Sequence, residues 1–265
     1  MTAPSQDGGA DLAVEGLRSS WADGVLELVL DRPAASNALS IAMRRGLIRA
    51  VRSADADPET RVVVLTGSDP TFSGGVDLTE SLGAGSAVPA GARTDPAAVV
   101  RAVRTPVIAA VNGPCYTGAL ELALSCSFVL ASDRATFADT HAAVGLLPGW
   151  GQSALLPRAV GVRLARQMML TGEPIDADTA LRAGLVTEVV PHAQLPARAR
   201  RLAASVRDAH AGAVEATLAL LAEGEGLGLA HALALEAQAG LRWRTDPAEV
   251  GRRFAARSRS PKKEY

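Results

Sequence analysis

Short apolar runs alternate with helical patterns in the first half of the chain. Residues 25–33, VLELVLDRP, alternate apolar and polar positions and end in turn residues, which predicts a strand and its exit loop. Three later runs, RVVVLTG (61–67), PVIAAVNG (106–113) and SFVLAS (127–132), are almost wholly apolar, as strands buried on both faces are. Strands that alternate with helices in this way predict a parallel sheet with right-handed crossovers.

The first helix is predicted after Ser40, which is a suitable N-cap. Its apolar side carries Ile41, Met43, Leu47, Ile48 and Val51. Residues 82–96, LGAGSAVPAGARTDP, predict a mobile surface loop. From about Leu155 the pattern becomes mainly helical, and one short strand, LVTEVV (185–190), interrupts it. Helices are expected in LARQMMLTG, DADTALRAG, QLPARARRLAASVRDA, AGAVEATLALLAEG, LGLAHALALEAQAGLRW and DPAEVGRRFAARS.

Composition narrows the class of protein. The chain has 265 residues and a formal net charge of −1, so it can bury a core and shows no charge excess that would indicate nucleic acid as a partner. Cys115 and Cys126 form neither a zinc motif nor a disulfide framework, and a reduced, cytoplasmic protein is expected. The N-terminus has no secretory pattern. Residues 106–131 are interrupted by Asn-Gly-Pro and Glu121, so no membrane span is expected.

Two glycine-containing turns each lead into a helix. In the first, PTFSGGVDLTE (70–80), Gly74 and Gly75 let the backbone turn sharply, and Asp77 with Glu80 has the spacing of a capping box. Asp77 is therefore interpreted first as a helix cap. Backbone N–H groups at such a helix start attract negative charge. The turn has neither the spacing of a Walker A loop nor that of a dinucleotide motif.

The second turn, NGPCYTG (112–118), precedes the helical segment ALELALS (119–125). Gly118 offers its N–H in the first turn of this helix, and Glu121 follows on the same face. If the two turns face each other, two backbone donors meet one carbonyl oxygen and a carboxylate lies alongside, which is the arrangement of an oxyanion hole. The alternative for Glu121 is a half-exposed helix residue without a chemical role.

Four segments, in this order and spacing, resemble the enoyl-CoA hydratase/isomerase (crotonase) superfamily: LDRPAASNALS, RVVVLTGSDPTFSGGVDLTE, PVIAAVNGPCYTGALELALSCSFVLAS and ATFADTHAAVGLLPGWGQSALLPRAVG. The resemblance implies an α/β fold of the crotonase type, a spiral of ββα units around two roughly perpendicular sheets, with a helical C-terminal region that builds trimers or hexamers. The implied organisation is a disordered N-terminus at 1–10, the spiral core at 11–200 and the helical region at 201–265.

Members of this family bind acyl-CoA thioesters and stabilise an enolate. Matched residue by residue, the resemblance implies oxyanion donors at the backbone N–H groups of Val76 and Gly118 and an acid/base group at Glu121. The positions matched to the CoA-lining residues are Ala38, Gly74, Gly75, Asp77 and Leu78. Coenzyme A is part of the substrate. No metal or redox cofactor is expected, because the sequence has neither a ligand cluster nor a nucleotide fingerprint.

The position of the family's second acid/base glutamate is occupied by His141, in ADTHAAVGLLPG (138–149). Three interpretations stay open: a replacement acid/base group, a polar contact to the substrate, and a structural residue bonded to nearby backbone. Asp139 can orient the imidazole only if a loop brings the two together. Trp150 is either a lid over the acyl pocket or a core residue. The remaining histidines, His192, His210 and His231, are expected on the surface or in packing.

The leading function is an enoyl-CoA hydratase that adds water to a 2-enoyl-CoA, with Glu121 as an acid/base group and, under the first of the three interpretations, His141 as its partner. The alternatives are an acyl-CoA double-bond isomerase, another enolate-forming thioester enzyme, and a non-catalytic acyl-CoA-binding paralogue that keeps the donors without the chemistry. The partners expected are the acyl-CoA substrate and further copies of the same chain.

Overall fold

The structure is a computed structural model that describes residues 14–83 and 94–259. The chain divides into two compact units, Met1–Ala216 and Thr217–Tyr265. The predicted disorder at 1–10 and most of the predicted loop at 82–96 lie outside the described residues. The predicted boundary between residues 200 and 201 stays a prediction.

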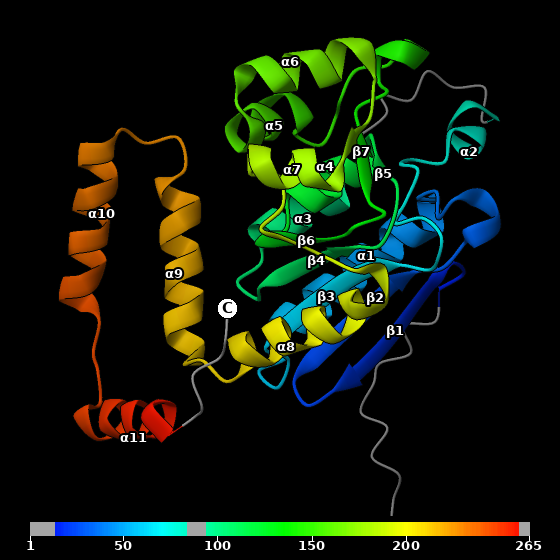
Figure 1. The fold of residues 1–265 in the computed structure, drawn as a ribbon. Helices are drawn as coiled ribbons and strands as arrows, with labels where there is room; N and C mark the ends of the chain where they lie inside the picture. Colours follow the sequence, from blue (N-terminus) through cyan, green and yellow to red (C-terminus); the bar gives the residue numbers. More distant parts are fainter. Residues whose placement is uncertain (1–13, 84–93, 260–265) are drawn as a thin grey trace, which may run out of the picture. The chain divides into compact units, whose positions relative to one another are not determined.

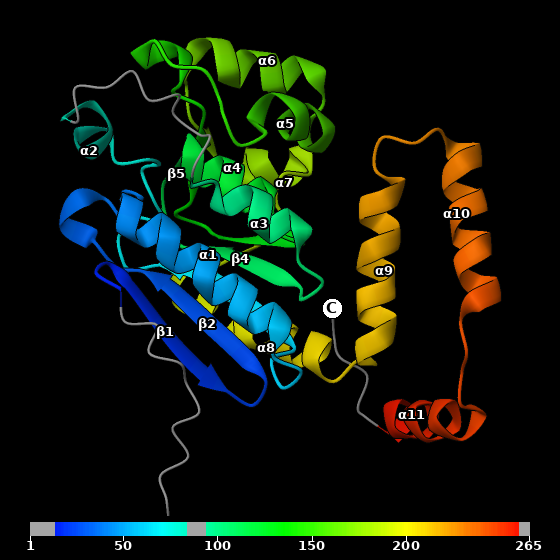
Figure 2. The same cartoon turned by 180° about the vertical axis from the view of Figure 1, so that it is seen from behind.

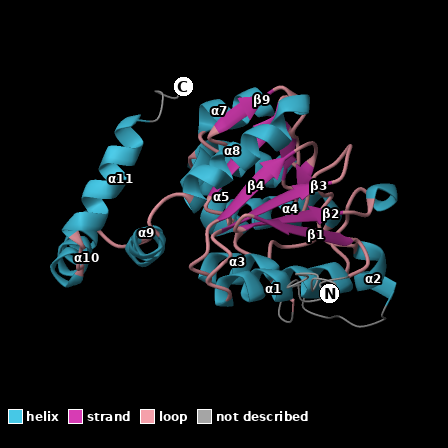
Figure 3. Cartoon of the chain, turned by 90° about the horizontal axis from the view of Figure 1, so that it is seen from below, coloured by secondary structure: helices cyan, strands magenta, loops and turns pink. Residues whose placement is uncertain are grey.

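A six-stranded sheet forms the centre of the first unit (Figures 1 and 3). Its order is β1-β2-β3-β4-β6-β9, with β1 antiparallel to β2 and every other pair parallel. The alternating run became β2, and the three apolar runs became β3, β4 and β6, as predicted. The strands are β1 (Leu17–Ala22), β2 (Val25–Leu30), β3 (Val62–Gly67), β4 (Val107–Val111), β6 (Phe128–Ser132) and β9 (Glu188–Val190).

The two faces of this sheet are covered by different helices. Successive residues of a strand point to opposite sides, so Val63 and Leu65 of β3 join the core cluster that includes α1, whereas Val62 and Val64 join the cluster that includes α8. Figure 2 shows α1 (Ile41–Ala56) and α3 (Pro96–Ala102) over one face, and Figure 1 shows α8 (Leu195–Arg207) over the other. The apolar runs predicted as buried strands are thus covered on both sides.

A second sheet of three short strands has the order β5-β7-β8. Its strands are β5 (Cys115–Tyr116), β7 (Thr136–Ala138) and β8 (Ile175–Asp176), and β5 and β7 are parallel. The remaining helices of the first unit are α2 (Leu78–Gly83), α4 (Gly118–Leu124), α5 (Gln152–Val160), α6 (Val162–Thr171) and α7 (Ala177–Ala183). The α/β architecture with two sheets agrees with the prediction.

Helix α1 begins as predicted, and Met43, Leu47 and Val51 of its predicted apolar side are buried. The Ser40 hydroxyl accepts the backbone N–H of Met43 at 3.1 Å, which is the expected cap. Ile41 is 37% exposed, so its placement on the apolar side is wrong. It precedes buried Met43 by two residues, which is roughly 200° around a helix. Arg44 is buried instead, at 7% exposure.

The second unit contains the end of α9 (Ala211–Gly224), together with α10 (Leu229–Arg242) and α11 (Pro247–Arg259). These three helices were predicted from the sequence and are confirmed. Large apolar side chains of this unit are exposed to solvent in the single chain: Leu221, Leu227, Leu229, Leu233, Leu241, Trp243, Val250 and Phe254.

Candidate active site

The first predicted turn is hydrogen-bonded to the loop that follows β2. Leu39 N–H donates to the carbonyl of Gly75 at 2.7 Å, and Asp77 N–H donates to the carbonyl of Leu39 at 3.2 Å. Gly75 has a φ of +101°, and a Cβ there would lie 3.0 Å from the carbonyl oxygen of Tyr116. Both features require glycine. The turn therefore has a fixed backbone that carries the N–H of Val76 at its end.

The second turn lies directly against the first. A parallel bridge joins Ser73 to Cys115. Thr117 has φ +54° and ψ −117°, a strained conformation for a residue other than glycine, and Gly118 then begins α4. A Cβ at Gly118 would lie 3.0 Å from Cγ2 of Val76 and 3.5 Å from its backbone nitrogen. The structure thus brings the two predicted donor residues into contact.

Two backbone donors are free at this contact. Within residues 14–83 and 94–259, neither Val76 N–H nor Gly118 N–H donates a hydrogen bond. Buried backbone N–H groups are almost always paired in folded proteins. Two unpaired donors on touching segments can therefore receive one carbonyl oxygen and stabilise the negative charge that develops on it.

Glu121 lies one turn into α4 and is only 2% exposed, so the alternative of a half-exposed helix residue is wrong. Its Oε1 accepts the backbone N–H groups of Trp150 at 2.6 Å and Gln152 at 3.1 Å. Burial raises the pKa of Glu121 above its ordinary value of 4.5, the two N–H groups and the charge of His141 oppose this effect, and the charge of Asp139 adds to it. A raised pKa suits a carboxyl group that exchanges protons near neutral pH.

His141 and Asp139 meet in the turn after β7. The strand ends at Ala138, and the backbone then bends so that Oδ1 of Asp139 accepts the backbone N–H of His141 at 3.1 Å and lies 2.6 Å from its Nδ1. The condition stated for Asp139 is therefore met, because a loop brings its carboxylate to the imidazole of His141. The other ring nitrogen, Nε2, lies 3.8 Å from Oε2 of Glu121. The two groups are close enough to bind one water molecule between them.

Two residues bonded to this pair, Asp139 to His141 and Gln152 to Glu121, also carry buried polar atoms without a partner among the described residues. Oδ2 of Asp139 and both amide atoms of Gln152 make no hydrogen bond within the described part of the chain. Gln152 is fully buried and Asp139 is 1% exposed. An unpaired buried polar group costs about 1–3 kcal/mol, so these atoms are available to a polar ligand or to water. Gln152 was missed in the sequence, because no motif marks it.

Trp150 is a buried core residue, at 2% exposure. A Cβ at Gly118 would lie 3.2 Å from the Trp150 ring, and Cζ of Arg44 lies 6.0 Å from the centroid of the same ring. Burial lowers the pKa of Arg44. The indole therefore packs between the second donor and a buried cation from α1.

The residues matched to CoA-lining positions lie on the segments around the first turn. Gly75 is buried and Gly74 is exposed, while Leu78 is 36% exposed at the start of α2. The carbonyl of Ala38 accepts Nη1 of Arg32 at 2.8 Å. Contact of these residues with CoA stays a prediction.

Asp77 is a helix cap. Its Oδ1 accepts the backbone N–H groups of Thr79 at 3.1 Å and Glu80 at 3.4 Å, and its Oδ2 pairs with Arg32 at 2.9 Å. The hydroxyl of Thr79 and the guanidinium of Arg32 lower the pKa of Asp77 to about 2. The reciprocal half of the predicted capping box is wrong, because Glu80 Oε2 instead accepts the N–H of Ile41 at the start of α1.

We expect Asp77→Asn to lower the free energy of unfolding by about 1–2 kcal/mol at neutral pH, since the amide keeps the cap but loses the charge that the lowered pKa reports. The native pKa lies below the ordinary 3.8, so the charge stabilises the fold above pH 4 and its contribution is lost as the pH falls towards 2. Urea unfolding at several pH values measures the difference between the two proteins. A difference that persists at pH 2 would show that the charge is not its source.

Asn37 is a further positioning residue that the sequence did not single out. It is fully buried with a φ of +51°. Its Nδ2 donates to the carbonyls of Ser68 and Thr71 at 2.7 and 2.6 Å, and its Oδ1 accepts the N–H of Arg32 at 2.8 Å. This amide joins the loop after β2 to the loop after β3, and the second of these loops leads to the Ser-Gly-Gly turn.

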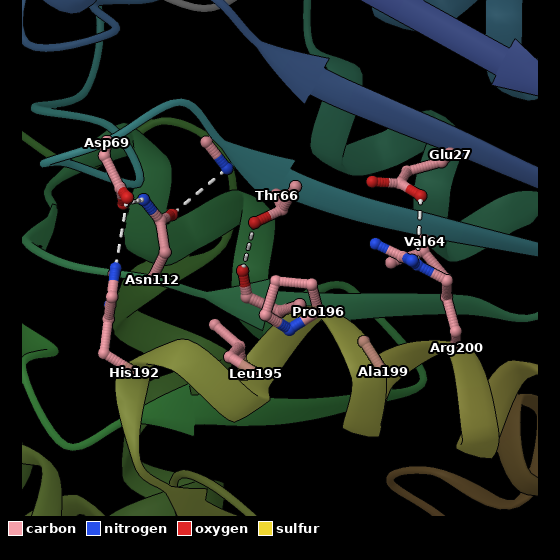
Figure 4. A pocket seen from close by; sticks show the side chains of 12 residues that line it. Glu27, Val64, Thr66, Asp69, Asn112, His192, Leu195, Pro196, Ala199 and Arg200 are labelled. Carbon is pink, nitrogen blue, oxygen red and sulfur yellow. Dashed lines mark hydrogen bonds and ion pairs between the residues drawn. The ribbon is translucent and has the colours of Figure 1, made fainter.

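A separate cavity of about 140 Å³ lies between α8 and the sheet (Figure 4). At its edge, Nε2 of His192 lies 3.1 Å from Asp69 Oδ2, and Nδ1 lies 3.1 Å from the hydroxyl of Ser132. Asn112 also donates to Asp69, at 3.0 Å. The Ser132 side chain is fully buried and accepts the N–H of Arg134. A buried hydroxyl cannot attack a substrate, so this constellation serves as a connection between loops.

Among the described residues there is no group of three or more His, Cys, Asp or Glu side chains that could hold a metal ion. In the same part of the chain, every helix is too short or too polar to cross a membrane. Cys115 and Cys126 are free thiols.

The sequence of the chain is similar to those of known proteins. A protein family described as enoyl-CoA hydratase/isomerase matches residues 21–241. A probable peroxisomal enoyl-CoA hydratase 1 of Arabidopsis thaliana is 37% identical over 213 residues, which cover 80% of each chain. A crotonyl-CoA hydratase of Syntrophomonas wolfei is 34% identical over 216 residues, with 80% of this chain and 83% of the relative covered.

The fold is also similar to the solved structures of enoyl-CoA hydratases. The crystal structure of an enoyl-CoA hydratase from Mycobacterium avium superposes with a TM-score of 0.73 at 44% sequence identity. The match covers 85% of this chain and 95% of that one.

Proposed function

The chain belongs to the enoyl-CoA hydratase/isomerase family, and from this membership we propose that it adds water to a 2-enoyl-CoA thioester at the site formed by Val76, Gly118, Glu121 and His141. The crotonase-type fold predicted from the sequence is confirmed by its similarity to the Mycobacterium avium hydratase. A relative whose name states crotonyl-CoA as its substrate supports the choice of substrate class.

The observation that carries the proposal is the pairing of two free backbone donors with two proton-exchanging groups. The thioester carbonyl accepts hydrogen bonds from the N–H groups of Val76 and Gly118. Glu121 and His141 then lie on the segments that begin at, or pack against, the second donor, and their facing atoms are 3.8 Å apart. A carbonyl group, a water molecule and an acid/base pair are the components that hydration of a conjugated thioester requires.

The reaction follows from this arrangement. Water binds between Oε2 of Glu121 and Nε2 of His141, and its oxygen forms a bond to the β-carbon while the unprotonated group of the pair takes its proton. The π electrons of the double bond move towards the thioester, whose oxygen becomes the oxyanion held by the two N–H groups. The protonated group of the pair then delivers its proton to the α-carbon, and the carbonyl re-forms. One water has been added, and the pair again holds one proton.

This scheme uses protein groups and water alone, so we propose that activity needs no metal or redox cofactor. The buried amide of Gln152 offers an unpaired donor and acceptor for the bound water or for a polar atom of the substrate.

Hydration of crotonyl-CoA and of a longer 2-enoyl-CoA is the direct test. The loss of the enoyl absorbance is followed, and the product is identified by mass as the 3-hydroxyacyl-CoA. We expect turnover by the wild type and a strong reduction in His141→Ala. Turnover of a 3-enoyl-CoA without hydration would replace the proposal by an isomerase. Binding of acyl-CoA without any turnover would instead assign a non-catalytic binding paralogue.

We also propose that the protein forms a homo-oligomer, a trimer or a hexamer, through its second unit. The support is the row of exposed apolar side chains on α9, α10 and α11, which a single chain leaves in contact with water. Leu233→Glu is expected to lower the mass measured by light scattering, whereas Glu236→Gln on the same helix is expected to leave it unchanged. A monomeric wild type would contradict the proposal. The cytoplasmic location stays a prediction.

A further inference from the structure

The contact between Asp139 and His141 is not explained by the fold alone. Asp139 is 1% exposed and follows the last residue of β7. Its Oδ1 accepts the backbone N–H of His141, which is enough to close the turn. The same oxygen also lies 2.6 Å from the ring nitrogen Nδ1 of His141. This second bond orients a side chain that already faces Glu121.

The bond to the carboxylate determines which ring nitrogen can exchange a proton. An ionised carboxylate only accepts hydrogen bonds, so Nδ1 of His141 carries the proton and donates it to Asp139. In the neutral imidazole, Nε2 is then the nitrogen with the free lone pair. This nitrogen lies 3.8 Å from Oε2 of Glu121, so the lone pair is at the place where the proposed reaction needs it.

The net charge of Asp139 and His141 together also bears on the role of Asp139. A glutamate at this position would supply one negative charge and one proton acceptor, whereas a neutral imidazole supplies the acceptor without the charge. Asp139 restores the missing charge, and its Oδ2 has no other partner in the described residues that would neutralise it. When Nε2 takes a proton, the resulting imidazolium lies beside a carboxylate that stabilises it.

We propose that Asp139 is a positioning residue, and that the Asp139–His141 couple acts as one unit in place of the second acid/base glutamate. This inference rests on the proposed hydratase function. Within residues 14–83 and 94–259, the carboxylates at ion-pair distance from His141 are Asp139, on its own turn, and Glu121, on α4. Asp139 does not touch the substrate. It fixes the tautomer and the orientation of the ring through the contact with Nδ1.

The test is Asp139→Asn, because the amide oxygen can keep both hydrogen bonds while the charge is lost. Removal of carboxylates that orient metal-bound histidines typically costs 10- to 100-fold in activity, and we expect a fall in kcat of about that size with little change in KM. The pH–rate limb that requires the protonated pair should also move to lower pH, because the charge of Asp139 contributes to the raised pKa of Glu121. The matched control is Asp133→Asn, whose carboxylate likewise accepts a backbone N–H, that of His192, at 2.9 Å.

A double-mutant cycle separates positioning from a merely structural role. If Asp139 acts through the imidazole, Asp139→Asn costs nothing further in a His141→Gln background. An equal loss in both backgrounds would overturn the proposal, and so would a wild-type kcat and pH profile in Asp139→Asn.

The double-mutant cycle can be measured only if the enzyme is active. A second measurement, which does not depend on turnover, is therefore needed. Proton NMR of the wild type should show a downfield Nδ1–H resonance that is absent in His141→Gln and moves in Asp139→Asn. An active enzyme in which this resonance is missing, or is unaffected by Asp139→Asn, would refute the couple alone. A normal couple in a protein that hydrates no 2-enoyl-CoA would refute the proposed function and leave the couple intact.

Discussion

Glu121→Gln is expected to lower kcat for hydration by two to four orders of magnitude, the range associated with loss of a general acid or base. The amide keeps the shape of the side chain, and its oxygen can still accept the N–H groups of Trp150 and Gln152. Its nitrogen cannot take a proton from water. Stopped-flow or steady-state hydration of crotonyl-CoA measures the loss, and the affinity for acyl-CoA should change little.

The same substitution is expected to leave the fold as stable as the wild type, or more stable, because a neutral amide is cheaper to bury than a carboxylate. The native pKa of Glu121 is raised above 4.5. The native state therefore holds its proton more tightly than the unfolded chain, and stability is lost as the pH rises from 4.5 through the raised value. The gain from Glu121→Gln should accordingly grow over that interval and then level off. A strongly destabilised variant would mean that the carboxylate serves the structure.

The sequence predicts those elements well whose residue pattern is compatible with only one type of secondary structure. Strands β3, β4 and β6 are buried on both faces, so each appears as a continuous apolar run. Strand β1 was missed because it lies at the edge of the sheet with five of its six residues exposed. Its sequence, LRSSWA, lacks both an apolar run and a regular alternation.

In the candidate site, too, some residues could be predicted from the sequence and others could not. Gly75, Val76, Gly118 and Glu121 lie within two short local motifs, and the family resemblance identified their positions. The partners of Glu121 could not be read from the sequence, because Trp150 and Gln152 are 29 and 31 residues away along the chain. Their contact with α4 exists only after the loop before α5 has packed against it.

The contact between Asp139 and His141 could not be predicted for another reason, the position at which strand β7 ends. Its separation of two residues from His141 is visible in the sequence, but the hydrogen bond depends on whether β7 ends before or after them. Because the strand ends at Ala138, the two side chains meet. A strand longer by three residues would extend through His141 and prevent the turn in which the bond forms. Strand ends are set by tertiary packing, so the residue pattern alone could not decide between the two arrangements.

Val76→Pro is expected to lower kcat by about 10²- to 10³-fold, which is the cost of removing one oxyanion donor. Proline has no backbone N–H, and the N–H of Val76 makes no hydrogen bond within the described residues, so no bond of the fold is lost with it. The matched control is Val76→Ala, which shortens the side chain that contacts Gly118 and keeps the donor. Hydration kinetics of the three proteins, with circular dichroism as the check on folding, measure the effect.

The two variants distinguish the donor from the side chain. If the oxyanion forms at this N–H, the proline variant loses transition-state stabilisation, the alanine variant keeps most of the activity, and both bind the ground-state thioester with similar affinity. Equal losses in the two variants would show that the packing of the Val76 side chain against Gly118 is needed for activity and that the donor is not. Because Glu121→Gln and Val76→Pro remove different parts of one transition state, the double variant should lose less than the product of the two separate losses. That result would place the acid/base pair and the donors in a single catalytic step.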